Sequence, residues 1–194
     1  MIEVRVLTGE ELLARLDDVA RLRIEVFRAF PYLYDGDLDY ERGYMRAYRE
    51  SPRAVVVAAF ADGAVVGVAT GTPLSDHDGQ FIQGFRASGY EPAEVFYCAE
   101  SVLLPQWRGH GIGHKFFDAR EAHARAQGFK YSAFCSVIRP ADHPARPADY
   151  RPLDAFWEKR GYRELPGVLA EFSWKDVGAL AEDAKALQFR IRPL

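Results

Sequence analysis

The chain has 194 residues, of which 48% are hydrophobic and 27% are charged, a balance that is ordinary for a globular fold with a sizeable core. The formal net charge of -3 argues against a nucleic-acid surface, which usually needs a basic patch. Apolar runs are too short to cross a bilayer, and the N-terminus is patterned as folded structure, so we expect neither a membrane span nor a signal peptide. Cys98 and Cys135 lie in apolar runs and predict buried free thiols in a reducing compartment. We therefore expect a single cytoplasmic domain over residues 1–194.

The first fifty residues predict a strand followed by two helices. Ile2–Leu7 alternates apolar and polar residues, as a half-buried strand does. Thr8 and Glu11 have the spacing of a capping box, so the first helix should begin there. After an aromatic, turn-rich stretch, Asp37 or Asp39 should cap the second helix.

The next segment predicts a β-hairpin. Arg53–Phe60 and Ala64–Thr70 are β-rich runs joined by Asp62-Gly63, and an Asp-Gly pair in this position is a strong hairpin signal. The following segment, Ser75–Gly89, has apolar residues at helical spacing and is interpreted as a short helix or an ordered insertion.

The middle of the chain predicts a strand, a helix and a second strand. Val95–Leu104 is almost entirely apolar, so we expect a central strand that is covered on both faces. The helix Gly113–Gln127 and the strand Phe129–Ile138 follow, and this order implies a parallel crossover. Ligands of open α/β sheets bind beyond the carboxyl ends of such strands. An irregular, proline-rich segment, residues 139–152, comes next.

The C-terminal segments complete the sheet. A short helix is expected over Leu153–Arg160, ended by Gly161. The last two strands are expected at Val168–Trp174 and Ala186–Ile191. An edge strand near the C-terminus offers a surface for pairing between chains, so a homodimer is one expectation.

The turn Gln106–Gly113 carries the most specific signal in the sequence. Its three glycines alternate with larger residues just as a helix begins. A helix start presents unpaired N–H groups and partial positive charge, and glycine lets an anion approach that backbone. The glycine spacing matches neither the P-loop nor the dinucleotide-binding fingerprint. The alternative is a glycine-rich surface turn that caps the helix and binds nothing.

This turn resembles the acetyl-CoA signature of the GNAT superfamily of N-acyltransferases. The resemblance is carried by the run Leu103-x-Pro105-x-x-Arg108-Gly109-x-Gly111-Ile112-Gly113. It implies an α/β fold with a mixed central sheet of about seven strands, flanking helices and splayed central strands. It also implies acetyl-CoA as co-substrate. The residues implied to hold its pantetheine arm and pyrophosphate are Val102, Leu103, Leu104, Arg108, Gly109, His110, Gly111, Ile112, Gly113 and His114, with Lys115 as a weaker candidate.

Glu100 is the candidate general base for acetyl transfer. It is the only charged residue in the strand Val95–Leu104, and members of the family often place a glutamate on this strand. A carboxylate in a dry strand tends to have a raised pKa, which suits a base near neutral pH. The alternative is a glutamate paired with an arginine, or one that reaches solvent at a bulge.

The general acid is the least familiar part of the pattern. Many family members have a tyrosine where this chain has Trp157, and an indole N–H donates a hydrogen bond without delivering a proton. Tyr150 and His143, in the proline-rich segment, are candidates for that proton, with an ordinary loop role as the alternative. The asparagine that often follows this strand in the family is replaced by Arg139-Pro140.

The resemblance places the acceptor pocket near the first two helices and their connecting loop. Phe30, Tyr32, Tyr34 and Asp35 fall in that loop and are the candidate substrate-binding residues. Aspartates near a turn are also typical caps, and the aromatic cluster is equally interpreted as a packed lid. His110 and His114 have the spacing of helical metal ligands but lack a third ligand, so no metal is expected.

These residues favour an N-acetyltransferase that moves an acetyl group from acetyl-CoA to a primary amine by direct attack in a ternary complex. The acceptor is a small molecule or a peptide of unidentified structure. The rival interpretation is an acyl-CoA-binding sensor or interaction module with little or no turnover.

Overall fold

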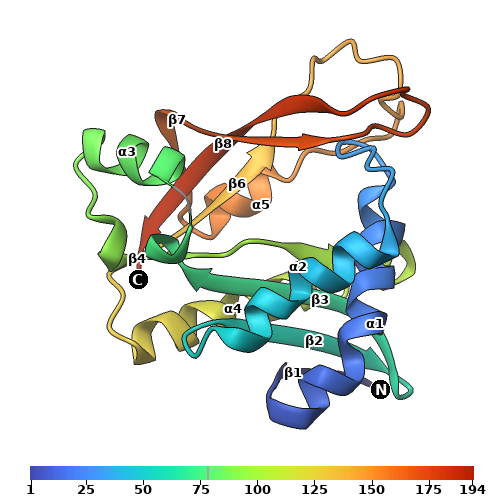
Figure 1. Cartoon of the computed structure of the whole chain (residues 1–194), viewed down its shortest axis with the longest axis horizontal. Helices are drawn as coiled ribbons and strands as arrows, with labels where there is room; N and C mark the ends of the chain where they lie inside the picture. Colours follow the sequence, from blue (N-terminus) through green and yellow to red (C-terminus); the bar gives the residue numbers. More distant parts are fainter. Residues whose placement is uncertain (78) are drawn as a thin grey trace.

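The structure is a computed structural model that describes residues 1–77 and 79–194. A twisted sheet runs through the molecule and helices cover both of its faces (Figure 1). The helices are α1 (Gly9–Phe27), α2 (Leu38–Glu50), α3 (Gly79–Ala87), α4 (Ile112–Ala126) and α5 (Asp154–Lys159). The strands are β1 (Ile2–Leu7), β2 (Val55–Ala61), β3 (Ala64–Pro73), β4 (Val95–Tyr97), β5 (Ser101–Leu103), β6 (Tyr131–Val137), β7 (Arg163–Trp174) and β8 (Asp183–Pro193).

The sheet has eight strands in the order β1-β2-β3-β4-β6-β8-β7, with β5 paired to β3. All pairs are antiparallel except β4 and β6, which are parallel as the strand-helix-strand order predicted. The mixed α/β class is therefore confirmed. The strand count exceeds the expected seven because one predicted strand is broken into two.

The expectation of one continuous strand over Val95–Leu104 is wrong. Tyr97 pairs with Thr72 and Ser101 pairs with Ala69, so three residues of this segment face two residues of β3. The extra residue is a β-bulge. At its centre the backbone of Thr70 bonds both Ala99 and Glu100. An apolar run shows burial but not the register of pairing, and the sequence pattern therefore missed the break.

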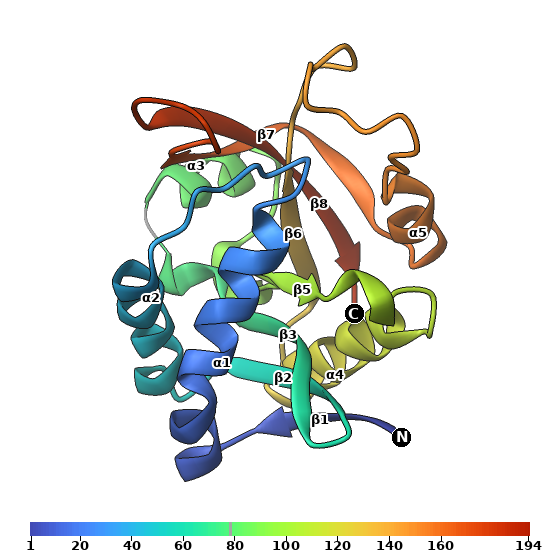
Figure 2. The ribbon, with the colours of Figure 1, turned by 90° about the vertical axis from the view of Figure 1, so that its right-hand side faces the viewer.

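The bulge opens the sheet between β4 and β6. These strands pair only through Val95–Tyr97 and Tyr131–Ala133, and beyond this point β5 follows β3 while β6 follows β8. Figure 2 shows the two halves of the sheet diverging, with β5 on one side and β6 and β8 on the other. The splay implied by the family resemblance is thus present.

The predicted hairpin is confirmed. Asp62 and Gly63 both adopt positive φ, 49° and 82°, as a two-residue turn with the twist of a hairpin requires. The short helix within 75–89 is also present as α3, although position 78 lies outside the described residues. Among the last strands, β7 begins earlier than predicted and contains a register shift between Glu164 and Leu169.

The two N-terminal helices begin where predicted, with different caps. The Thr8 side chain makes no capping hydrogen bond, and the Glu11 carboxylate, the other half of the predicted capping box, forms a bidentate pair with Arg5. At α2, Asp37 Oδ1 accepts a 2.9 Å hydrogen bond from the Tyr40 N–H, so Asp37 rather than Asp39 is the cap.

Strand β2 shows how the core is divided. Val55, Val57 and Ala59 face α4, whereas Val56 and Ala58 face α1 and α2, and all five are buried. Since both faces are covered, the strand is uniformly apolar. A further cluster packs α3 against the strands beyond the splay. None of the described helices is both long enough and apolar enough to cross a membrane.

Candidate active site

The glycine turn forms an open backbone cradle at the start of α4. Gly109 and Gly111 have φ values of 80° and 75°, and a Cβ atom added at either would meet nothing within 4 Å. Within the described chain, no hydrogen bond engages the N–H groups of Gly109, His110 or Gly111. Gly113 differs, because its Cβ position lies 3.4 Å from the Phe156 ring, where α4 packs against α5. The cradle therefore has the geometry of an anion site.

A cavity of about 1790 Å³ connects this cradle to the splay and to the loop between α1 and α2. Most of the predicted site residues line it. The candidates that do not are Val102, Leu104, His110, Lys115 and His143. The predicted residues that line it are Phe30, Tyr32, Tyr34, Asp35, Glu100, Leu103, Arg108, Gly109, Gly111, Ile112, Gly113, His114, Tyr150 and Trp157. The sequence therefore predicted a set of residues that the fold does bring together.

The three residues expected to contact the pantetheine arm, Val102, Leu103 and Leu104, differ in the direction in which their backbone N–H and C=O groups point. Leu104 donates its N–H to Val66, and Glu100 accepts from Thr70. In an antiparallel ladder such bonds alternate, so Val102 also points its backbone groups toward β3. Leu103 and Ser101 point theirs toward the gap. Of the expected trio, Leu103 alone presents its backbone to the cavity.

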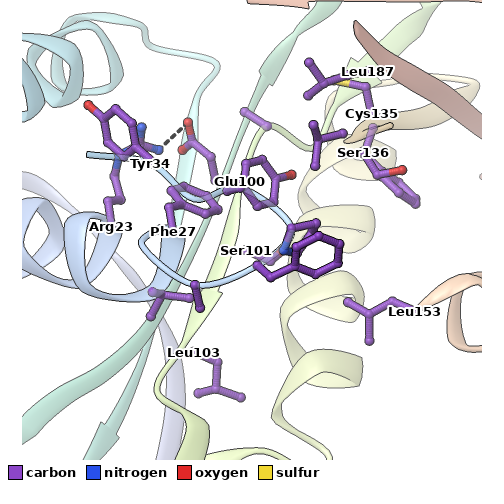
Figure 3. A pocket seen from close by; sticks show the side chains of 18 of the residues that line it. Arg23, Phe27, Tyr34, Glu100, Ser101, Leu103, Cys135, Ser136, Leu153 and Leu187 are labelled. Atoms are coloured by element: carbon purple, nitrogen blue, oxygen red, sulfur yellow. Dashed lines mark ion pairs between the residues drawn. The ribbon is translucent and has the colours of Figure 1, made fainter. Parts of the chain in front are cut away.

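Glu100 sits in the bulge with its side chain 13% exposed. Its carboxylate accepts hydrogen bonds from the hydroxyls of Tyr44 and Thr70, the latter at 2.8 Å, and pairs with Arg23 (Figure 3). Burial and the charge of Glu100 raise the pKa of Tyr44, which stays a neutral donor. The arginine-paired alternative is thus the arrangement found, and it occurs at a bulge. About one of the four acceptor positions of the carboxylate is left for another group.

Arg23 is a site residue that sequence reasoning missed. Its guanidinium also contacts Glu41, which is fully buried, so two carboxylates share one cation. A signal was present in the sequence, because Arg23 continues the apolar face of α1 that includes Val19 and Ala20. A charge within such a stripe indicates a buried partner.

Trp157 lies on α5, against Phe134 at 5.0 Å between ring centroids and beneath the Arg190 guanidinium at 4.8 Å. Tyr150 lies in the proline-rich segment, where its ring meets the edge of Phe30 at 4.7 Å, and partial burial raises its pKa. The His143 ring contacts the same Phe30 ring in a tilted arrangement, with the ring centroids 5.7 Å apart. Phe30 thus links the candidate acids Tyr150 and His143 to the loop between α1 and α2, residues 28–37, which we call the acceptor loop.

The acceptor loop is fixed from the far side by Arg139. This residue donates to the carbonyl oxygens of Pro31 and Tyr32, each at 2.8 Å, and forms a bidentate pair with Asp176. Trp174 adds a 3.0 Å bond to the same Tyr32 carbonyl. Figure 1 shows this loop rising from α1 to the end of the β7-β8 hairpin. Arg139, which stands where the family often has asparagine, therefore holds the acceptor loop in place through these bonds.

Asp35 carries a charge that is already compensated. It pairs with Lys175 at 2.7 Å and with Arg28 at 3.2 Å, and the Lys175 hydrogen bond and charge lower the pKa of Asp35. It is therefore a weaker attractor of a cationic substrate than the sequence suggested. His114 is 3.2 Å from Arg160, and the described residues contain no cluster of metal-binding side chains.

The model of the acetyltransferase (GNAT) family matches residues 15–162. The chain belongs to the GNAT acetyltransferase family. The fold and the resemblance drawn from the glycine turn are confirmed.

Solved structures support the same fold. A ribosomal-protein-alanine N-acetyltransferase from Brucella melitensis has a TM-score of 0.63 at 17% identity, and the match covers 99% of each chain. An acetyltransferase-class protein from Salmonella typhimurium, solved with its cofactor acetyl-CoA, has a TM-score of 0.63 at 15% identity, covering 100% of this chain and 94% of that one.

A curated relative, mycothiol acetyltransferase from Thermobifida fusca, is 33% identical over 82 residues, which is 42% of this chain. The match spans a quarter of that relative's length, 25%.

Proposed function

We propose that this GNAT enzyme transfers an acetyl group from acetyl-CoA to a primary amine of a small molecule or peptide, by direct attack in a ternary complex. The observation that carries the proposal is one continuous cavity, which joins the open backbone cradle to Glu100 and to the aromatic acceptor loop. Two substrates bound in one cavity react with a high effective concentration.

The cradle fits the pyrophosphate of acetyl-CoA. Its unengaged N–H groups at residues 109–111 and the first turn of α4 supply donors and partial positive charge. Arg108 adds a full charge beside them, and its Nε donates to the Leu103 carbonyl at 3.3 Å. In this proposal Val102 and Leu104 fix the position of the strand through their bonds to β3, while Leu103 contributes backbone groups to the arm.

The chemistry needs a deprotonated amine. The amine nitrogen forms a bond to the acetyl carbon as the carbon–sulfur bond breaks, and the sulfur leaves with the bonding electron pair. Glu100 accepts the amine proton through its remaining acceptor position, directly or through water, which typically contributes about a hundredfold or more. Trp157 donates a hydrogen bond to the departing thiolate, and Tyr150 is the candidate for the final proton.

A second candidate function is an acyl-CoA-binding module with little turnover. Two observations favour it: Trp157 cannot deliver a proton at neutral pH, and most acceptor positions of Glu100 are engaged within the protein. The proposed soluble, cytoplasmic setting fits both candidates, since Cys98 and Cys135 are free thiols.

One experiment separates the two candidates. Purified protein is mixed with acetyl-CoA and a panel of small amines and peptides, and free thiol is followed over time. Thiol release that depends on an amine supports the enzyme. Thermal stabilisation by CoA without thiol release supports the binding module. If CoA causes neither thiol release nor thermal stabilisation, the placement of CoA in the cradle is contradicted.

A further inference from the structure

Arg120 on α4 is a buried cation without a carboxylate partner. Arg120 is 1% exposed, and no ion pair joins it to a carboxylate among the side chains that the structure describes. All of its observed acceptors are neutral. Nη1 donates to the carbonyl oxygens of Thr70 and Glu100, at 3.2 and 2.9 Å, and Nη2 donates to Ser101 Oγ at 2.9 Å. The guanidinium therefore bonds both strands at the bulge.

These contacts fix the hydrogen-bonding role of Ser101. A guanidinium has only donors, so the Ser101 oxygen must accept from Arg120 and its own proton must point elsewhere. Within the described chain that proton has no acceptor, and the residue is exposed and lines the cavity. Figure 3 places Ser101 beside Glu100, on the wall that faces Cys135 and Ser136 across the cavity.

The opposite wall offers a contrast. Ser136 Oγ also accepts from an arginine, Arg190, at 2.8 Å. Arg190, however, is neutralised by Asp154 and Glu164, at 2.6 and 2.8 Å. Of the two arginines that donate to these serines, Arg120 alone has no carboxylate partner among the described side chains. A full positive charge on the donor strengthens the hydrogen bond that the attached hydroxyl donates in turn.

We propose that Ser101 donates its hydroxyl hydrogen bond to the negative charge that develops on the acetyl carbonyl oxygen during transfer, with Arg120 as the positioning residue that holds the bulge and the hydroxyl. This inference rests on the proposed acetyl transfer. Donors fixed in advance and aimed at developing charge are among the largest contributors to enzymatic rate. The backbone direction of Ser101, toward the gap, places its N–H on the same side.

Kinetics of Ser101 variants test the proposal. We expect Ser101→Ala to lower kcat about a hundredfold with little change in KM for acetyl-CoA, because the bond strengthens only as charge develops. Ser101→Thr keeps the hydroxyl and should recover most of the rate. Ser136→Ala is the matched control, and its kcat should stay at least about tenfold higher than that of Ser101→Ala. A Ser101→Ala enzyme within about threefold of wild type would overturn the proposal.

The role of Arg120 is tested by coupling. Arg120→Lys should lower kcat strongly in the wild-type background and only slightly in the Ser101→Ala background, because both changes remove one interaction. Equal losses in both backgrounds would overturn the positioning role. Lysine keeps the buried charge, so this variant retains more of the fold than a neutral replacement.

A readout without turnover separates this inference from the proposed function. The carbonyl stretch of bound, isotope-labelled acetyl-CoA is measured by infrared spectroscopy in wild type and in Ser101→Ala. A shift that is present in wild type and reduced in the variant supports Ser101 as donor. The same shift in both proteins overturns it, whereas failure of wild type to bind acetyl-CoA contradicts the proposed function itself.

Discussion

Arg23 and Glu100 form an ion pair between α1 and the bulge that separates β4 from β5. The same guanidinium contacts Glu41, so the cation retains a carboxylate if Glu100 is neutralised. This arrangement ties the acceptor-side helices to the splay. A neutral isostere at position 100 therefore leaves Arg23 paired with Glu41 and not as an isolated buried cation. Such a variant can test the chemical role of Glu100 separately from its role in packing.

Glu100→Gln should slow turnover while leaving acetyl-CoA affinity nearly intact. The amide keeps the size and most hydrogen bonds of the side chain but cannot take up the amine proton. We expect kcat to fall by about a hundredfold. Steady-state kinetics and a CoA thermal-shift titration measure the two quantities. An unchanged kcat would remove Glu100 from the mechanism.

Gly111→Glu should abolish binding of CoA. The substitution places bulk and negative charge in the cradle, at a φ of 75° that side chains rarely adopt. Gly128→Glu is a matched control, because Gly128 follows α4 with a φ of 82° and also has nothing within 4 Å of its Cβ position. Calorimetric titration should show affinity lost in the first variant alone. Equal affinities would place the phosphates elsewhere.

Glu121→Gln should destabilise the fold without touching the cradle. The Glu121 carboxylate is buried and lies 3.1 Å from Arg160 and 3.0 Å from the Tyr162 hydroxyl. Breaking a buried pair typically costs about 3 kcal/mol or more. Urea unfolding measures the loss. Asp118→Asn removes the exposed partner of the same Arg160 and should cost about 1 kcal/mol or less.

Local sequence patterns predicted those parts of the molecule that depend on neighbours along the chain. The Asp62-Gly63 hairpin, the glycine turn and α4 are of this kind, because turn chemistry and helical periodicity are local properties. The bulge at Ala99 and Glu100 was not predictable in this way. It depends on the register with β3, which an apolar run does not encode.

The sequence predicted which residues line the site better than it predicted their interaction partners. Residues that line the cavity were found from the motif, but their partners come from distant segments. Arg23, Arg120 and Arg139 reach the site from two helices and a loop, and each one was either overlooked or noted only as a departure from the family pattern. Their role depends on tertiary placement, and the local signal was limited to the apolar helix faces on which Arg23 and Arg120 lie.

Stability should fall as pH rises above about 9, in part through Cys135. Burial raises the pKa of the Cys135 thiol to about 12, from 9.0. Between these values the unfolded chain releases a proton that the folded chain keeps, so the thiol's contribution is fully present below pH 9 and is lost as pH approaches 12. The expected slope from this one group is at most about 1.4 kcal/mol per pH unit.

The Cys135→Ala variant isolates this contribution from those of other buried groups. Burial also raises the pKa values of Cys98 and Tyr97, so wild type and variant should both lose stability in alkali. The variant should lose less, and the difference between the two free energies of unfolding should narrow from pH 9 upward. Urea unfolding at a series of pH values measures this difference. Parallel curves across the range would mean that the thiol titrates alike in the folded and unfolded chains.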